Sequence, residues 1–165
     1  MAPARAGQGG FTYLGLLFAI AILGITLATV GVVWSTQIRR DREAELLFIG
    51  DQFRVAIGRY VQSGGIYPRA LADLVEDKRV PVPRRFLRRV YADPMTGNAD
   101  WQLIHTADGG IMGVASSSQQ QPIKVAGFPT ADAAFADAAC YCDWTFNYVA
   151  RINSRKRLPQ PPKSH

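Results

Sequence analysis

The sequence predicts an α+β protein in which a long N-terminal helix packs against a small head domain of short helices and an antiparallel β-sheet. Residues 11–34 are uncharged and free of proline, and the stretch that follows stays free of proline and carries apolar residues at steps of three and four. The later part alternates turn signals with short apolar segments. These shifts divide the chain into a leader (1–10), an apolar helix half (11–34), an amphipathic helix half (35–63), a head domain (64–153) and a basic, proline-rich tail expected to be disordered (154–165).

The apolar half reads FTYLGLLFAIAILGITLATVGVVW. At about 1.5 Å per residue, a helix of this length can cross a hydrocarbon core of about 30 Å. A signal peptide has a shorter apolar core of about 7–15 residues and a small-residue cleavage site after it. A buried core helix is the alternative, but so long an uncharged run is rare outside membranes. We therefore predict that residues 11–34 form a transmembrane segment.

The segment before the apolar run differs sharply from it in composition. The leader MAPARAGQGG is short and basic, ends in a glycine pair, and is followed abruptly by Phe11 and Thr12. This arrangement resembles the N-terminus of type IV prepilins and type II secretion pseudopilins. The resemblance implies a pilin-like fold, cleavage between Gly10 and Phe11 by a prepilin peptidase, and N-methylation of Phe11. Gly15 stands where the family usually has a glutamate, a departure that resembles the minor pseudopilin at a filament tip.

The resemblance also implies a function. The expected protein is a structural, non-catalytic subunit of an envelope-spanning type II secretion filament, which assembles through its N-terminal helix and drives protein secretion. Its expected partners are homologous pseudopilin or pilin subunits, the prepilin peptidase and an inner-membrane assembly platform, without nucleic acid. The glycines of the apolar run could permit close approach of neighbouring helices, but they are equally well explained as neutral positions that face lipid. The residues expected to mediate assembly are Phe11, Leu14, Leu17, Gly24 and Gly31.

The expected location is the bacterial inner membrane, crossed once, with the N-terminus in the cytoplasm and the C-terminal domain in the periplasm. The positive-inside rule argues for the reverse orientation, because Arg39, Arg40 and Arg42 outnumber Arg5 near the ends of the apolar run. We give the processing motif more weight because it is the more specific signal.

The amphipathic half of the helix carries one apolar stripe, and the spacing of three and four places its members on one face. We expect the head to pack on this stripe, whose residues are Leu46, Ile49, Phe53, Ile57 and Tyr60. A glycine pair at residues 64–65 is expected to end the helix.

The head is predicted from local signals in order. A short helix follows Pro68, and residues 101–106 and 111–116 flank a glycine-containing turn, as in a β-hairpin. Residues 130–139 predict a short helix capped by Thr130. Residues 140–149 alternate with aromatic side chains and are predicted to form the last strand.

Hard oxygen donors gather around one predicted turn, and the resemblance to major pseudopilins implies a calcium-binding loop in the head. The candidates are Asp93, Asn98, Asp100 and Asp108. Their spacing matches no recognised calcium loop, so we interpret them as turn-forming residues and expect no cofactor, with calcium as the alternative.

The cysteines and histidines do not predict an enzyme. In a strand, Cys140 and Cys142 would lie about 7 Å apart, beyond the usual reach of a disulfide. We therefore favour free buried thiols over a strained disulfide. Two cysteines with His105 and His165 are too few for a structural zinc site. The sequence also lacks a nucleophile motif and a phosphate-binding glycine loop.

The net charge of +6 is concentrated in basic clusters at residues 39–42, 78–89 and 151–157. Solvated surfaces are the favoured interpretation, and contact with nucleic acid is the alternative. Two other functions remain open. One is a minor pilin of a type IV pilus or DNA-uptake filament, and the other is a membrane-tethered binding domain that never assembles.

Overall fold

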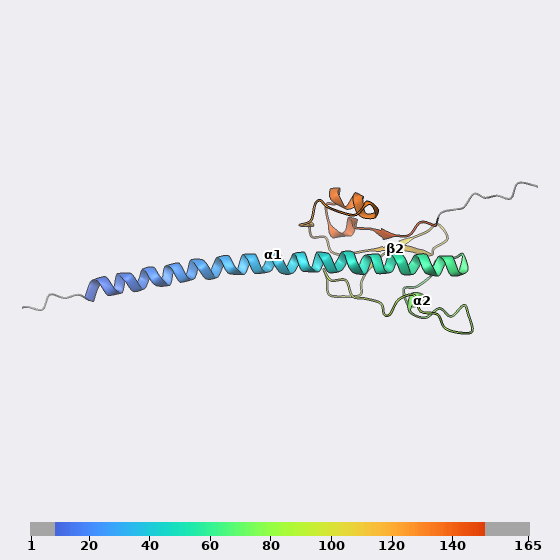
Figure 1. The fold of residues 1–165 in the computed structure, drawn as a ribbon, viewed down its shortest axis with the longest axis horizontal. Coiled ribbons are helices and arrows are strands. Elements are labelled where there is room, and N and C mark those ends of the chain that lie inside the picture. The colour runs from blue at the N-terminus through green and yellow to red at the C-terminus, as the bar shows by residue number, and fades with distance from the viewer. Residues whose placement is uncertain (1–8, 151–165) are drawn as a thin grey trace, which may run out of the picture. The chain divides into compact units, whose positions relative to one another are not determined.

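The computed structural model describes the backbone of residues 9–150 and the side chains of residues 12–24 and 34–150. Within this range the protein has the predicted α+β class, with one long helix and a small antiparallel sheet (Figure 1). The chain divides into two compact units, Met1–Arg42 and Glu43–His165, and helix α1 contributes to both. The described elements are α1 (Gly9–Gly64), α2 (Ala72–Val75), β1 (Gln102–His105), β2 (Ile111–Ala115), the 3-10 helices η1 (Thr130–Asp137) and η2 (Tyr141–Asp143), and β3 (Phe146–Asn147).

Helix α1 begins two residues before the predicted start and ends at the predicted glycine pair. The N–H of Gly65 donates to the carbonyl of Val61 over 2.6 Å. Gly65 has a φ of +73°, a left-handed conformation that favours glycine and commonly closes a helix. The sequence therefore sets the end of α1 through backbone conformation as well as through the loss of apolar periodicity.

The described strands form one antiparallel sheet in the order β1-β2-β3. The predicted hairpin is present, with Leu103 opposite Val114. β3 pairs with the other edge of β2, where Gly113 lies opposite Asn147. A Cβ atom on Gly113 would stand 2.7 Å from the Asn147 Cα, so only glycine admits β3 at this distance. Gly113 thus allows the C-terminal segment to join the sheet.

Two predictions about the C-terminal part of the head were wrong. Residues 140–149 do not form one strand, because the chain turns at η2, where the Trp144 N–H donates to the Tyr141 carbonyl over 3.1 Å. Only Phe146–Asn147 is a strand. The preceding helix is a 3-10 helix whose N-cap is Pro129, and the Thr130 side chain makes no capping hydrogen bond. In this part of the head, tertiary contacts determine the secondary structure of short segments more strongly than local propensity does.

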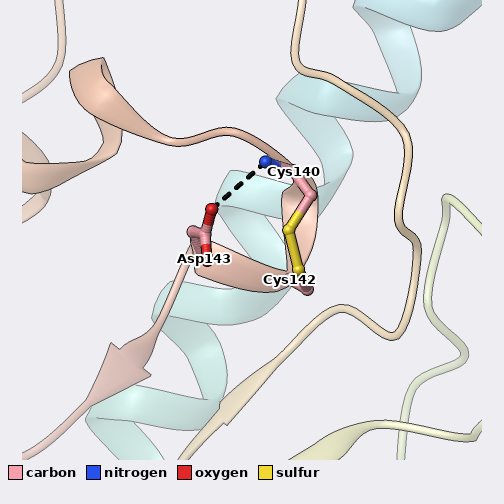
Figure 2. Close-up of side chains that lie close together, drawn as sticks. All are labelled: Cys140, Cys142 and Asp143. Carbon is pink, nitrogen blue, oxygen red and sulfur yellow. Dashed lines mark hydrogen bonds between the residues drawn. A yellow bond between two sulfur atoms is a disulfide. The ribbon is translucent and has the colours of Figure 1, made fainter.

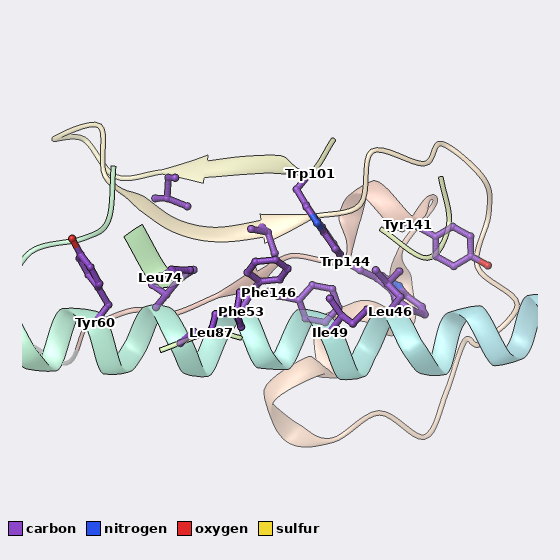
Figure 3. Close-up of a cluster of buried hydrophobic side chains, with 14 of the residues drawn as sticks. Leu46, Ile49, Phe53, Tyr60, Leu74, Leu87, Trp101, Tyr141, Trp144 and Phe146 are labelled. Atoms are coloured by element: carbon purple, nitrogen blue, oxygen red, sulfur yellow. The ribbon is translucent and has the colours of Figure 1, made fainter. Parts of the chain in front are cut away.

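The core of the second unit lies along one face of α1. In Figure 3, Leu46, Ile49 and Phe53 point from α1 toward the strands, and the side chain of Phe146, from β3, lies in the same buried layer. The rings of Phe53 and Trp101 meet edge to face with centroids 5.2 Å apart. In Figure 1 the sheet and residues 130–143 lie on one side of this half of α1, and α2 lies on the other. The head therefore packs on two sides of this part of the helix, while Phe48 and Val55 remain exposed.

The predicted membrane anchor is corrected by the structure. In the part of the chain that it describes, no helix combines the length and the apolar character that a membrane crossing requires. This finding contradicts a single-pass location in the bacterial inner membrane with a cytoplasmic N-terminus and a periplasmic C-terminal domain.

Candidate functional site

The strongest candidate for an interaction surface is the N-terminal part of α1. Every described residue from 12 to 24 is exposed. The exposed fractions are 66% for Tyr13, 52% for Leu14 and 45% for Leu17. The other large apolar side chains exposed in this range are Leu16, Phe18, Ile20, Ile22 and Leu23. Contiguous apolar surface of this kind marks a site of interaction with another molecule.

The predicted processing site lies at the start of α1. Gly10 has a helical backbone, and so does Phe11, whose side chain is outside the described residues. Residues 1–8 of the predicted leader and the predicted disordered tail are also outside them. Gly15, the departure from the family pattern, is followed by exposed apolar residues. A Cβ atom added to Gly15 would meet nothing within 4 Å, so this position has room for a larger side chain.

The residues predicted for assembly share the same surface where they are described. Leu14 and Leu17 lie one turn apart on the helix and are both exposed. Gly24 has open space around it, since an added Cβ would meet nothing within 4 Å. Gly31 lies in residues 25–33, whose side chains are outside the described part of the chain. This surface is available to a partner helix at each described position.

The predicted stem–head stripe lies inside the core of the second unit. Its members have exposed fractions of 5% or less: Leu46 0%, Ile49 5%, Phe53 0%, Ile57 0% and Tyr60 4%. α1 is therefore exposed in its described apolar segment and buried along this stripe. One helix thus supplies both an accessible apolar surface and the centre of a folded head.

Two glycines of α1, which the sequence reasoning missed, admit aromatic rings from the C-terminal segment. A Cβ atom on Gly50 would lie 2.3–2.4 Å from three ring atoms of Phe146. A Cβ atom on Gly58 would lie 2.9 Å from two ring atoms of Tyr148. The helix backbone itself therefore forms part of the surface that packs against Phe146 and Tyr148. The signal was the spacing of eight residues between these glycines within the amphipathic half.

Glu43 is a second residue that sequence reasoning missed. Its side chain is only 3% exposed, although it lies in a charged segment of α1. One carboxylate oxygen, Oε1, accepts hydrogen bonds from the Tyr141 hydroxyl at 2.9 Å and from the Ile123 and Lys124 N–H groups at 2.6 and 3.2 Å. A buried carboxylate needs such donors because its desolvation is costly. Glu43, the first residue of the second unit, therefore links α1 to two distant segments of the head.

A polar clasp holds the C-terminal end of α1. Arg79 donates to both carboxylate oxygens of Asp77 over 2.8 Å, and also to the Tyr60 carbonyl and the Ser63 hydroxyl. Its guanidinium lies 3.6 Å from the centre of the Tyr60 ring. The hydrogen bonds from Arg79 hold the pKa of the buried Asp77 carboxyl below its usual value, and burial raises the pKa of the Tyr60 hydroxyl. Arg79 thus adds a hydrogen bond to a backbone carbonyl near the end of the helix.

Of the calcium candidates, Asp93, Asn98 and Asp100 lie in or beside one turn, and Asp108 lies apart from them. Ser117 links two of the carboxylates, since its N–H donates to Asp93 at 3.3 Å and its hydroxyl donates to Asp100 at 3.1 Å. Asp93 is fully buried and accepts hydrogen bonds from the Ser116 hydroxyl at 2.6 Å and the Met95 N–H at 2.9 Å. Asp100 accepts from Thr96, a hydrogen bond that lowers the pKa of the Asp100 carboxyl. Asp108 lies in the hairpin turn, beyond the His105–Ile111 pair and away from the Gln102–Ala115 pair.

Asn98 contributes through its backbone, since its carbonyl accepts from the Asp93 N–H at 2.7 Å. The carbonyl of Asp93 in turn accepts from the N–H of Gly97, which has a φ of +79°. Asp93, Asn98 and Gly97 therefore form a hydrogen-bonded turn, and Ser116 joins it to the end of β2.

The preference for free thiols was wrong, because Cys140 and Cys142 form a disulfide (Figure 2). The predicted strand would have set the cysteines about 7 Å apart. The 3-10 turn of η2 brings their Cα atoms to 5.1 Å, within the usual range for a disulfide. The Asp143 carboxylate accepts from the Ala139 and Cys140 N–H groups at 2.9 and 3.2 Å and so closes the same turn.

A basic loop projects from the head beside α2. The Phe86 and Leu87 N–H groups both donate to the Leu74 carbonyl, at 2.9 and 2.8 Å, which anchors the loop to the core. Leu87 is 4% exposed. The arginines around this anchor are exposed: Arg84, Arg85, Arg88 and Arg89. Phe86 and Leu87 therefore anchor the loop to the core, and the four arginine side chains beside them are exposed to solvent.

No protein-family model, no curated protein and no solved structure matches this chain.

Proposed function

We propose that this chain is a non-catalytic, pilin-like subunit of a filament of the type II secretion kind, assembled through the N-terminal part of α1 and serving protein secretion. One observation carries the proposal: α1 is exposed and apolar over residues 12–24 and forms the centre of the head from residue 46 onward. A subunit that stacks through a helical stem and displays a head needs these two properties in one helix. The processing motif at Gly10 and Phe11 supports the same interpretation.

The exposed segment carries enough apolar surface to support association. Covering a large apolar side chain contributes roughly 1.5 to 3 kcal/mol. Eight such side chains are exposed between residues 12 and 24. Cover of this set is therefore of the same order as the cost of bringing two molecules together, which is about 4 to 15 kcal/mol. Neighbouring copies or homologous subunits are the partners that this surface fits, because two apolar helices can pack along their lengths.

The first test is the N-terminus of the protein isolated from its native cells. Intact mass and N-terminal peptide analysis should find a chain that starts at Phe11, with or without one added methyl group. This result is expected if a prepilin peptidase recognises the glycine pair and the apolar helix after it. A chain that starts at Met1 or Ala2 would exclude this processing pathway and, with it, the proposed class of subunit.

A second test addresses assembly itself. Single cysteines placed at Leu14 or Leu17 should crosslink between copies in cells that contain the complete system. Val82 provides a matched control, because its side chain is 76% exposed in the head and is not expected to crosslink. Absence of crosslinks at the helix positions would favour a binding domain that never assembles.

A second candidate function is a minor pilin of a DNA-uptake filament, which the basic loop favours. Phosphate contacts by its four exposed arginines would make DNA binding by the full chain strongly salt-dependent. Neutralising about four phosphates predicts roughly a 100-fold loss of affinity between 50 and 200 mM salt. Glutamine at Arg84, Arg85, Arg88 and Arg89 should remove the binding. Binding that ignores salt, or no binding, would exclude this candidate.

A further inference from the structure

We propose that Cys140, Cys142 and Asp143 form a binding site for a thiophilic divalent cation such as Zn²⁺ once the disulfide is reduced. The three side chains lie on four consecutive residues of the η2 turn (Figure 2). Their potential ligand atoms all lie within 4.8 Å of one another. The site is independent of the exposed part of α1 on which the proposed function rests.

The turn holds the donors at a separation that a metal requires. In tetrahedral coordination with Zn–S bonds of about 2.3 Å, two sulfur ligands lie about 3.8 Å apart. The Cys140 and Cys142 Cα atoms are 5.1 Å apart, and both side chains point to the same place because they form a disulfide. Small side-chain rotations after reduction therefore bring the two Sγ atoms to the distance that zinc requires, and the backbone of η2 can remain in place.

Two oxygen donors complete the set. Asp143 Oδ2 accepts from two backbone N–H groups, which fixes the carboxylate beside the cysteines and leaves Oδ1 as a ligand atom. The Gln119 Oε1 lies 3.6 Å from the Cys142 Sγ. Two thiolates, a carboxylate and an amide oxygen or water make a four-coordinate set. Thiolates favour Zn²⁺ over Mg²⁺ or Ca²⁺, which prefer oxygen ligands.

A dithiol reductant supplies the electrons and protons that reduce the disulfide. The dithiol transfers two electrons and two protons to the Cys140–Cys142 disulfide, which becomes two thiols while the dithiol closes to a cyclic disulfide. Zn²⁺ then binds the two sulfurs as thiolates and releases two protons. Cys142 is half-buried and Asp143 is exposed, so reductant and metal can both reach the site. The disulfide and the metal complex are alternative crosslinks of one turn.

The experiment uses the full chain in oxidised and reduced forms. After reduction with a dithiol and its removal under anaerobic conditions, the chain is titrated with Co²⁺ as a spectroscopic substitute for Zn²⁺. We expect one equivalent to produce a thiolate-to-cobalt charge-transfer band, which Zn²⁺ then removes. The oxidised chain should give no band, because both sulfurs are occupied by the disulfide. The background is low, since the chain contains two cysteines and two histidines.

Variants separate coordination from folding. Asp143→Asn should weaken Co²⁺ binding about tenfold or more, whereas Asp137→Asn, an exposed acidic residue nearby, should leave it unchanged. Cys142→Ser should abolish the band, and near-ultraviolet circular dichroism reports whether the aromatic side chains of the head remain packed. Native mass spectrometry of the reduced wild-type chain counts bound Zn²⁺ without any variant. No bound Zn²⁺ in the reduced form, or equal Co²⁺ binding by the oxidised form, would overturn the proposal.

Discussion

Replacing Gly50 with alanine tests how the head is attached to α1. In an exposed helix this change stabilises by about 1 kcal/mol, because alanine has the higher helix propensity. At Gly50 the new Cβ would lie 2.3–2.4 Å from three atoms of the Phe146 ring. That ring is fully buried, and the Phe135 ring stands 5.2 Å from it, centroid to centroid. The ring therefore has little room to withdraw, and we expect Gly50→Ala to destabilise the head.

The magnitude follows from two opposing contributions. Overpacking a well-packed core typically costs about 1 to 3 kcal/mol, and overlap with three ring atoms places this site at the upper end. Subtracting the gain in helix propensity of about 1 kcal/mol leaves a net loss near 2 kcal/mol in the free energy of unfolding. For a unit of this size the loss corresponds to a decrease in Tm of about 8 °C.

Thermal unfolding of the full chain, followed by tryptophan fluorescence, measures the effect. Gly58→Ala should cost less, because its Cβ would meet the half-buried Tyr148 ring at 2.9 Å. Gly24→Ala is the matched control, with nothing within 4 Å of the new atom. Adding Phe146→Leu to Gly50→Ala should recover part of the loss, a coupling of at least about 1 kcal/mol. Equal Tm values for the three alanine variants would refute the reasoning.

Three further predictions concern buried carboxylates, each measured by chemical denaturation of the full chain. Glu43→Ala should lower the free energy of unfolding by about 2 to 4 kcal/mol, because it leaves the buried Tyr141 hydroxyl and two partly buried N–H groups without this acceptor. An unchanged value would contradict this role. Asp77→Asn should cost about 2 kcal/mol at neutral pH. Because the folded-state pKa of Asp77 is lowered from 3.8, its contribution is complete above that pH and is lost as the pH falls through the lowered value, so the two stability curves should converge in acid. Asp93→Asn should cost about 2 kcal/mol by weakening the bond from Ser116, and added Ca²⁺ should change neither protein; calcium stabilisation of the wild type alone would instead support a calcium loop.

The broad architecture can be predicted from the sequence because it depends on local patterns that extend over many residues. Apolar residues at steps of three and four predict the second half of α1, and Gly64–Gly65 predict its end. The hairpin of β1 and β2 also follows from local signals, since two apolar runs flank a turn containing Gly109, whose φ is +76°. In each case the residues that decide the structure are close neighbours along the chain.

The remaining features depend on contacts between distant residues. Glu43 stands among charged residues, and nothing nearby indicates that its main partner is Tyr141, 98 residues later. Aromatic alternation after Cys140 predicted a strand, whereas burial of Tyr141 and Trp144 favours the η2 turn. That turn brings the cysteines together and makes the disulfide. Periodicity therefore predicts a long helix more reliably than it predicts a short element or the partner of one side chain.

The long-range contacts of α1 also determine the order in which the protein can fold. Arg54 pairs with Asp132, and the Gln62 side chain donates to the Tyr148 hydroxyl, across separations of 78 and 86 residues. A ribosome adds about 5–20 residues per second, so α1 emerges several seconds before the segments that cover its core-facing side. During that interval its apolar stripe is open to other nascent chains. Such non-local closure is slow, and we expect the completed head to form only after synthesis has passed Tyr148.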